Sequence, residues 1–353
     1  MEILHIYLCK IHKLPQITLI YVLIISASKN IFSNSRFLLI FVYNHLINSD
    51  LGCITLKISQ LLKNKINLTC NDINIRDPFV LFDDGKYYMY GTRAKNFGIK
   101  VGGFDVYVSE DLENWSQPIE CFNSDKHDMN IEVNWAPEVH KYKDNYYMFA
   151  TFTRKSCKLR GTYILKADNP LGPFTPHSKG IVTPEEWECL DGTLYISKDG
   201  KPYVVFCHEH TQIINGTICY APLSDDLTET IGDAITLFRA SDPYWADKID
   251  DEKEHRITDG PFMYRTKTGE LLMLWSTFIK HQYAECLVKF TDGEIGMNFE
   301  HLPPLIDDDG GHGMLFNDKY GNLWLTYHSP NQTDYERPHF VSVEDTGNTI
   351  IIK

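Results

Sequence analysis

The sequence predicts an all-β fold, a five-bladed β-propeller. Apolar and polar residues alternate with a period of two through much of the chain, and almost no stretch shows helical periodicity. One hairpin pattern occurs five times: a short apolar strand, a turn that carries Asp, Asn or Gly, and a second strand rich in Tyr, Met and Phe. The first strands of these hairpins start at Asp77, Trp135, Asp191, Asp259 and His312, which lie 58, 56, 68 and 53 positions apart. This spacing suits four-stranded blades with generous loops.

The five hairpins can be read directly from the printed sequence. In chain order they are RDPFVLFDDGKYYMYGT from Arg76, WAPEVHKYKDNYYMFAT from Trp135, LDGTLYISKDGKPYVVFCHE from Leu190, TDGPFMYRTKTGELLMLWST from Thr258 and GHGMLFNDKYGNLWLTYHS from Gly311. A second pair of strands follows several of them, as in FDVYVSEDLENWS at 104–116 and GTYILKADNPLGPF at 161–174. Each hairpin with its following strands therefore predicts one blade.

A propeller brings residues from distant parts of the chain to one face. The first strand of each blade is innermost and the second returns beside it, so first-strand starts and second-strand ends meet around the axis. The starts supply Asp77, Trp135, Asp191, Asp259 and His312, and the ends supply Glu209, Trp275 and His328. An Asp-Gly step is also an ordinary turn signal. Three carboxylates at one blade position, however, favour chemistry over turn formation.

The first part of the chain differs from the rest. Residues 1–67 are predicted to be an N-terminal extension, and residues 68–353 the propeller. The run ITLIYVLIISAS at 17–28 follows two lysines and is similar to a signal-peptide core, but it is short for a membrane span. The alternative is a poorly ordered extension with little consequence for function. The compartment stays open, with the cytoplasm favoured over secretion.

Composition excludes several classes of partner. The net charge of -13 argues against nucleic acid, whose phosphates need a basic stripe, and against a polybasic membrane surface. The 20 tyrosines and 19 phenylalanines suit a strand-rich fold and a carbohydrate-binding surface. Nine cysteines without a C-x-x-C pair argue against structural zinc. A neutral or weakly charged ligand, an oligosaccharide or polysaccharide, is expected.

From about residue 71 to the end, the chain resembles glycoside hydrolase family 43. The resemblance rests on five motifs in order: RDP at 76–78, S-D-W at Ser109, Asp111 and Trp115, WAP at 135–137, DG-L-Y at 191–195 and GHGM at 311–314. It implies a five-bladed propeller that hydrolyses glycosidic bonds with inversion, mainly in arabinose- and xylose-containing glycans. A carbohydrate-binding propeller that has lost catalysis is the alternative.

The resemblance also implies roles for the carboxylates. Asp77 matches the general base, which must stay ionised to take a proton from water. Asp191 matches the aspartate that tunes and orients the acid. The fourth-blade acid is usually a glutamate, but this chain has Asp259. Either Asp259 donates the proton, or the role has moved to Glu209 at the end of the third hairpin, which is favoured by a small margin.

Further side chains are expected near the sugar. Trp135 is expected to stack on a sugar ring, with a place in the core as the alternative. Glu138 is expected to bond the substrate or a neighbouring blade, and Trp275 and His328 are also expected to contact substrate. In the family a histidine at the place of His312 often helps to hold a metal ion, commonly calcium with waters. A hydrogen-bonded structural role is the alternative, and no organic cofactor is expected.

Overall fold

The computed structural model describes residues 5–10, 21–26, 40–42, 67–93, 102–252 and 254–353. The chain divides into two compact units, residues 1–65 and 66–353. In the first unit, β1 (His5–Lys10), β2 (Tyr21–Ser26) and β3 (Ile40–Val42) form one sheet in the order β1-β2-β3. The signal-like run at 17–28 lies partly outside the described residues, and its interpretation stays a prediction.

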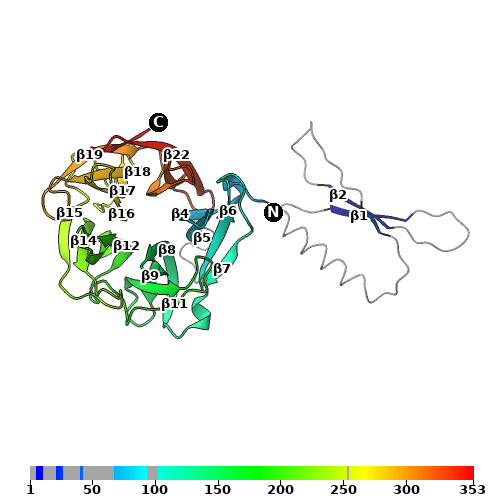
Figure 1. The fold of residues 1–353 in the computed structure, drawn as a ribbon, viewed down its shortest axis with the longest axis horizontal. Helices are drawn as coiled ribbons and strands as arrows, with labels where there is room; N and C mark the ends of the chain where they lie inside the picture. Colours follow the sequence, from blue (N-terminus) through cyan, green and yellow to red (C-terminus); the bar gives the residue numbers. More distant parts are fainter. Residues whose placement is uncertain (1–4, 11–20, 27–39, 43–66, 94–101, 253) are drawn as a thin grey trace, which may run out of the picture. The chain divides into compact units, whose positions relative to one another are not determined.

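The second unit is a ring of five four-stranded antiparallel sheets, so the predicted five-bladed propeller is confirmed (Figure 1). The first blade holds β4 (Ile75–Asp83), β5 (Lys86–Arg93), β6 (Phe104–Ser109) and β7 (Ile119–Phe122). The second holds β8 (Ile131–Tyr142), β9 (Asn145–Arg154), β10 (Arg160–Ala167) and β11 (Thr175–Pro176). The third holds β12 (Cys189–Ile196), β13 (Pro202–His208), β14 (Thr217–Pro222) and β15 (Ile235–Arg239).

The remaining two blades follow the same plan. The fourth holds β16 (Asp259–Arg265), β17 (Leu271–Ile279), β18 (Gln282–Phe290) and β19 (Phe299–Ile306). The fifth holds β20 (Gly311–Asn317), β21 (Leu323–Ser329), β22 (Arg337–Asp345) and β23 (Ile350–Ile352). Short helical turns occur at η1 (Cys70–Asp72), η3 (Ser124–Lys126) and α2 (His210–Ile213). No helix among the described residues combines the length and apolar character needed to cross a membrane.

The ring closes through side chains between its first and last blades. All four strands of the fifth blade come from one continuous segment, so no strand is shared with the first blade. The Asn74 amide donates to the Glu336 carbonyl (2.9 Å), and Arg76 Nη1 lies 3.3 Å from Glu336 Oε1. Near the axis, the Asp77 N–H donates to Nδ1 of His328 (3.2 Å). The contacts that close the ring therefore involve the same segment that carries Asp77, the predicted base.

Aromatic side chains fill the spaces between blades, and Trp275 is one of them. It is fully buried in a cluster from the third and fourth blades, with its ring 5.0 Å from that of Phe238 and 6.2 Å from that of Trp245. The predicted substrate contact of Trp275 is therefore corrected to a role in the core. Successive strand residues face opposite sides, and it is the next residue, Ser276, that bonds the axial segment of the fifth blade.

Candidate active site

Each first strand carries a bulge at its inner end, and the bulge sets the direction of one side chain. The register shifts there in β4, β8, β12, β16 and β20. One residue in each bulge has a left-handed backbone: Asp77 (φ 54°), Ala136 (φ 46°), Asp191 (φ 54°), Gly260 (φ 49°) and His312 (φ 53°). A non-glycine residue is strained in this region, and such strain is concentrated at functional sites.

These bulges correct the blade alignment drawn from the sequence. The residue equivalent to Asp77 in the second blade is Ala136 rather than Trp135, and in the fourth blade it is Gly260 rather than Asp259. Trp135 and Asp259 each lie one residue before the bulge position. Because neighbouring strand residues point in different directions, both side chains leave the backbone differently from Asp77 and Asp191.

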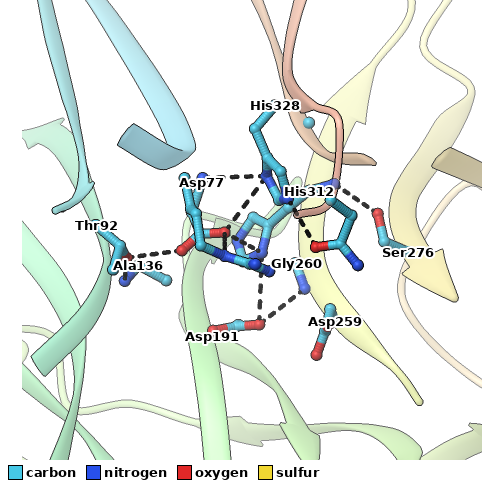
Figure 2. Close-up of polar contacts among 12 residues, drawn as sticks. Asp77, Thr92, Ala136, Asp191, Asp259, Gly260, Ser276, His312 and His328 are labelled. Carbon is cyan, nitrogen blue, oxygen red and sulfur yellow. Dashed lines mark hydrogen bonds and ion pairs between the residues drawn. The ribbon is translucent and has the colours of Figure 1, made fainter. Parts of the chain in front are cut away.

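Hydrogen bonds hold the bulges against the preceding blades, and Figure 2 shows those made by Ala136, Gly260, His312 and Asp77. In four junctions the bulge N–H donates to a side chain near the end of the preceding blade's second strand. The bonds are Ala136 N to Thr92 Oγ1 (2.6 Å), Asp191 N to Thr151 Oγ1 (2.8 Å), His312 N to Ser276 Oγ (2.7 Å) and Asp77 N to His328 Nδ1 (3.2 Å). In the remaining junction Cys207 occupies that strand position, and the Gly260 N–H donates to Asp191 Oδ2 (3.1 Å) instead.

Asp77 is held as an ionised carboxylate. Its Oδ2 accepts a hydrogen bond from Thr92 Oγ1 (2.7 Å), and its Oδ1 lies 3.2 Å from His312 Nδ1 and 3.9 Å from Arg76 Nε. Burial alone would raise the pKa of Asp77, but the charges of His312 and Arg76 and the Thr92 bond lower it below its usual value. The group therefore has the charge that a general base needs at neutral pH.

His328 supports Asp77 from behind the pocket. Its ring is fully buried, and burial together with the charge of Arg76 lowers the pKa of His328 to about 3. Nδ1 accepts from the Asp77 N–H, which leaves the proton on Nε2, 3.3 Å from Asn331 Oδ1. The 3.6 Å approach of Nδ1 to Asp77 Oδ1 is then a contact of a neutral ring and not an ion pair. The predicted substrate contact of His328 is corrected to positioning of the Asp77 backbone.

Asp191 and His312 form a second buried group beside Asp77. His312 Nδ1 lies 3.7 Å from Asp191 Oδ2 as well as 3.2 Å from Asp77 Oδ1. Burial would lower the pKa of His312, but Asp77, Asp191 and Asp259 raise it to about 9. Burial raises the pKa of Asp191 to about 8 against the opposing charge of His312. The imidazole thus links two aspartates that differ in their tendency to ionise.

Asp259 has a raised pKa that lies just below neutral pH. Burial and the charge of Glu209 raise the pKa of Asp259 to about 6, while the charge of His312 and a hydrogen bond from Tyr283 oppose this rise. Tyr283 Oη donates to Asp259 Oδ2 over 3.0 Å. Asp259 is also more exposed than Asp77, Asp191 or Glu209. It can therefore carry a proton and still reach the solvent side of the site.

Glu209 lies at the start of α2, and donors face both of its oxygens. Oε1 accepts from the His210 N–H (3.1 Å), and Oε2 lies 2.8 Å from Arg160 Nη2. Thr211 Oγ1 approaches Oε2 at 3.4 Å, and His210 Nε2 lies 3.5 Å from Oε1. The residue is 4% exposed. This environment stabilises the negative charge on Glu209.

The four predicted catalytic carboxylates line one cavity of about 410 Å³. Trp135 and His312 line it too, so the structure brings together six of the nine residues singled out from the sequence. The other lining residues are Arg76, Arg160, Leu190, His210, Thr211, Ile257, Phe278, Tyr283, Asn331 and Thr333. The combination of several carboxyl groups with aromatic and hydroxyl side chains suits a polyhydroxylated ligand.

Glu138 lies outside this cavity. It is 5% exposed, and its Oε2 is 3.2 Å from Nε2 of His140 in the same strand. Together with Asp77 and His312 it lines a separate cavity of about 10 Å³, which is at the lower limit for one water molecule. The predicted substrate contact of Glu138 is therefore corrected to a place beneath the site.

The surroundings of His312 do not form a cage for a metal ion. Within the described part of the chain, no group of three or more His, Cys, Asp or Glu side chains could hold a metal. Nδ1 of His312 faces two aspartates, which suits a protonated ring, and a protonated imidazole has no lone pair to offer a metal. These residues do not fit a protein-ligated calcium ion. Calcium held mainly by water stays a prediction.

Several residues of the site were not singled out from the sequence. Thr92 ends the YGT of the first hairpin and Thr151 the FAT of the second, so a recurring threonine was the available signal. Arg160 and Tyr283 come from third strands, where no motif marks them. Glu285 is fully buried, and its Oε2 accepts from Ser276 Oγ (3.0 Å) and the Gly313 N–H (2.8 Å). Burial raises the pKa of Glu285 to about 8.

Solved structures share this architecture. An endo-arabinase from Bacteroides thetaiotaomicron is 38% identical over 79% of this chain and 98% of that chain, with a TM-score of 0.72. An endo-1,4-beta-xylanase from the same organism (21% identity, 82% and 97% coverage, TM-score 0.65) shares the fold. So does an alpha-L-arabinofuranosidase from Lactobacillus brevis (17% identity, 78% and 93% coverage, TM-score 0.64). None of the curated proteins compared with the chain matches it.

The match at family level covers most of the propeller. Residues 72–343 match the family described as Glycosyl hydrolases family 43, and this range contains all five first strands and the whole cavity lining. The sequence motifs, the ring of five blades and the family match agree. The protein therefore belongs to glycoside hydrolase family 43.

Proposed function

We propose that the protein hydrolyses arabinose- or xylose-containing glycans, arabinan and its oligosaccharides first, with inversion of configuration. The observation that carries the proposal is one cavity lined by Asp77, whose pKa is lowered, and Asp259, whose pKa is raised to about 6. The choice of arabinan is supported by the 38% identity to a protein described as an endo-arabinase. A base and an acid in one pocket are the two groups that an inverting glycosidase needs.

The proposed reaction is a single displacement. Asp77 takes a proton from a water molecule as the water oxygen attacks the anomeric carbon. The bond from that carbon to the leaving oxygen breaks, and Asp259 gives its proton to the leaving oxygen. His312 keeps Asp77 charged through the 3.2 Å contact, and Asp191 holds the residue directly after Asp259 by accepting the Gly260 N–H.

The assignment of the acid to Asp259 differs from the small preference for Glu209 that the sequence suggested. Donors face both oxygens of Glu209, so in this geometry neither oxygen is placed to carry a proton toward the substrate. The negative charge of Glu209 in turn helps to keep Asp259 protonated, because it raises the pKa of Asp259. The two carboxyl groups thus act as a pair, with the proton on Asp259.

Trp135 is proposed as the surface that holds a sugar ring. Its side chain is partly exposed and lines the cavity, and the Arg160 guanidinium lies over its ring, 5.1 Å from the centroid. An indole gives a flat apolar face against which the C–H bonds of a pyranose or furanose ring pack. This contact would orient the sugar without adding charge to the pocket.

A panel of substrates tests the proposed function. We expect the purified protein to release sugar from arabino-oligosaccharides or arabinan, and from a nitrophenyl α-L-arabinofuranoside or β-xyloside as a simple probe. Reducing-sugar release and nitrophenolate absorbance would be measured. Binding of these glycans by calorimetry without any release would instead support the non-catalytic carbohydrate-binding propeller.

A further inference from the structure

Arg160 is the first residue of β10, the third strand of the second blade, and its side chain is 12% exposed. Its guanidinium contacts residues from three other places in the chain. Nε and Nη2 both donate to Glu188 Oε1 (2.8 and 2.5 Å), and Nη2 also lies 2.8 Å from Glu209 Oε2 and 3.0 Å from Thr211 Oγ1. The guanidinium lies over the Trp135 ring as well. The Arg160 side chain thus contacts both Trp135, the proposed sugar-binding surface, and Glu209. Glu209 and Asp259 are called the acidic pair.

Titratable and charged side chains from several neighbouring elements face Glu209. Arg160 from β10 is the positive group at ion-pair distance. His210 on α2 lies 3.5 Å away, and its own ring meets His255 of the loop before β16, Nδ1 to Nδ1 at 2.9 Å. Burial lowers the pKa of His210, so Arg160 is the cation of this group. Two negative groups oppose Arg160: Glu188, whose other oxygen accepts from Thr211 Oγ1, and Asp259 from β16.

This arrangement decides where the proton of the acidic pair lies. Two neighbouring carboxyl groups do not ionise together easily, so one of them keeps its proton to a higher pH than it would alone. A buried cation next to one member stabilises the charge on that member, and a planar guanidinium does so with directed hydrogen bonds. Arg160 contacts Glu209 at ion-pair distance, while Asp259 accepts a hydrogen bond from the neutral Tyr283 hydroxyl. The charges of His312 and Arg76 also act on Asp259, but they do not prevent the rise of its pKa.

We propose that Arg160 is a positioning residue that keeps the negative charge of the pair on Glu209, so that the transferable proton stays on Asp259, and that supports the Trp135 indole. The inference rests on the proposed function and deepens it. In this arrangement Arg160 acts through Glu209 and not on the sugar. Its removal would move the proton within the pair without removing either carboxyl group.

Carboxyl carbon NMR titrations test the location of the proton independently of turnover. In Arg160→Gln, we expect the last titration step of the pair formed by Glu209 and Asp259 to move to higher pH, because the pair loses an adjacent positive charge. Arg160→Lys keeps a positive charge and should retain most of the parent behaviour. Arg154→Gln is the matched control, because Arg154 Nη2 donates to the Glu185 carbonyl (2.7 Å) and Arg154 lies outside the cavity lining. Asp259→Asn and Glu209→Gln assign the two signals.

The pH dependence of kcat/KM gives the second readout. In the parent, kcat/KM should fall as rising pH removes the proton shared between Glu209 and Asp259. In Arg160→Gln this fall should occur at higher pH, because the positive charge that favours ionisation of both carboxyl groups is gone. This displacement should disappear in the Glu209→Gln background, since Arg160 then has no charged partner to act through. KM should rise in Arg160→Gln as Trp135 loses its support.

A titration of the carboxyl pair that is unchanged in Arg160→Gln would overturn the inference, and so would a shift of equal size in Arg154→Gln. A displacement of the pH limb that persists in the Glu209→Gln background would also contradict it. A parent protein that releases no sugar from any glycan refutes the proposed function instead. The NMR titration would still decide the role of Arg160 in that case, so the two failures can be told apart.

Discussion

Asp77→Asn is expected to lower kcat on arabino-oligosaccharides by about 10²–10⁴-fold, the usual contribution of a positioned general base. The amide is nearly the same size as the carboxylate and can still accept the Thr92 hydrogen bond, but it cannot take a proton from water. The ion pair with His312 is lost with the charge. Sugar release under saturating substrate, with the fold followed by circular dichroism, measures the effect.

A control from the same strand separates catalysis from folding. Asp83 lies at the other end of β4, pairs with Lys141 and lies outside the cavity lining. Asp83→Asn should leave kcat close to that of the parent. If Asp77→Asn hydrolyses glycans at the parent rate, Asp77 is not the base and the proposed mechanism is wrong.

The rate of hydrolysis by Asp259→Asn is expected to depend strongly on the leaving group of the substrate. On natural glycans we expect kcat to fall by about 10²–10⁴-fold, because the sugar alkoxide leaves poorly without a proton. A nitrophenyl glycoside needs little protonation of its leaving group and should be hydrolysed at a rate much nearer to that of the parent. The ratio of the two rates in each variant is the measurement.

The pH profile gives the same assignment by another route. Since the pKa of Asp259 is raised to about 6, the protonated acid is lost as the pH rises through that value, and parent kcat/KM should fall there. Asp259→Asn should lack this limb. Glu209→Gln should keep the parent's modest dependence on the leaving group. If rescue by nitrophenyl substrates is found in Glu209→Gln and not in Asp259→Asn, the donor is Glu209.

The blade order and the gathering of acidic residues could be predicted because each depends on a local, repeated pattern. Every hairpin carries its own turn residues and alternation, so five repeats fix five blades. What failed is the position of single residues within that pattern. The sequence aligned Trp135 and Asp259 with Asp77 and Asp191, but the residues at the equivalent place in the shared bulge are Ala136 and Gly260, one position later. A sequence repeat of varying length does not locate such a bulge.

The direction of side chains near the ends of the second strands could not be predicted from the sequence either. A shift of one residue sends a side chain to the opposite face, and this separates the buried Trp275 from Ser276, which reaches the axial segment. Arg160 could not be found at all, because its partners Glu188 and Glu209 lie 28 and 49 residues further along the chain and meet it only when the second and third blades pack together. No local sequence pattern predicts contacts of this kind.

The anomeric form of the first product tests the account most directly. Proton NMR during the early hydrolysis of an arabino-oligosaccharide shows whether the released sugar keeps or reverses its configuration before it mutarotates. Attack by water held at Asp77, with Asp259 assisting departure, predicts a product of inverted configuration. A first product of retained configuration would require a covalent intermediate on the enzyme, and it would contradict the assignment of Asp77 as a base that acts through water.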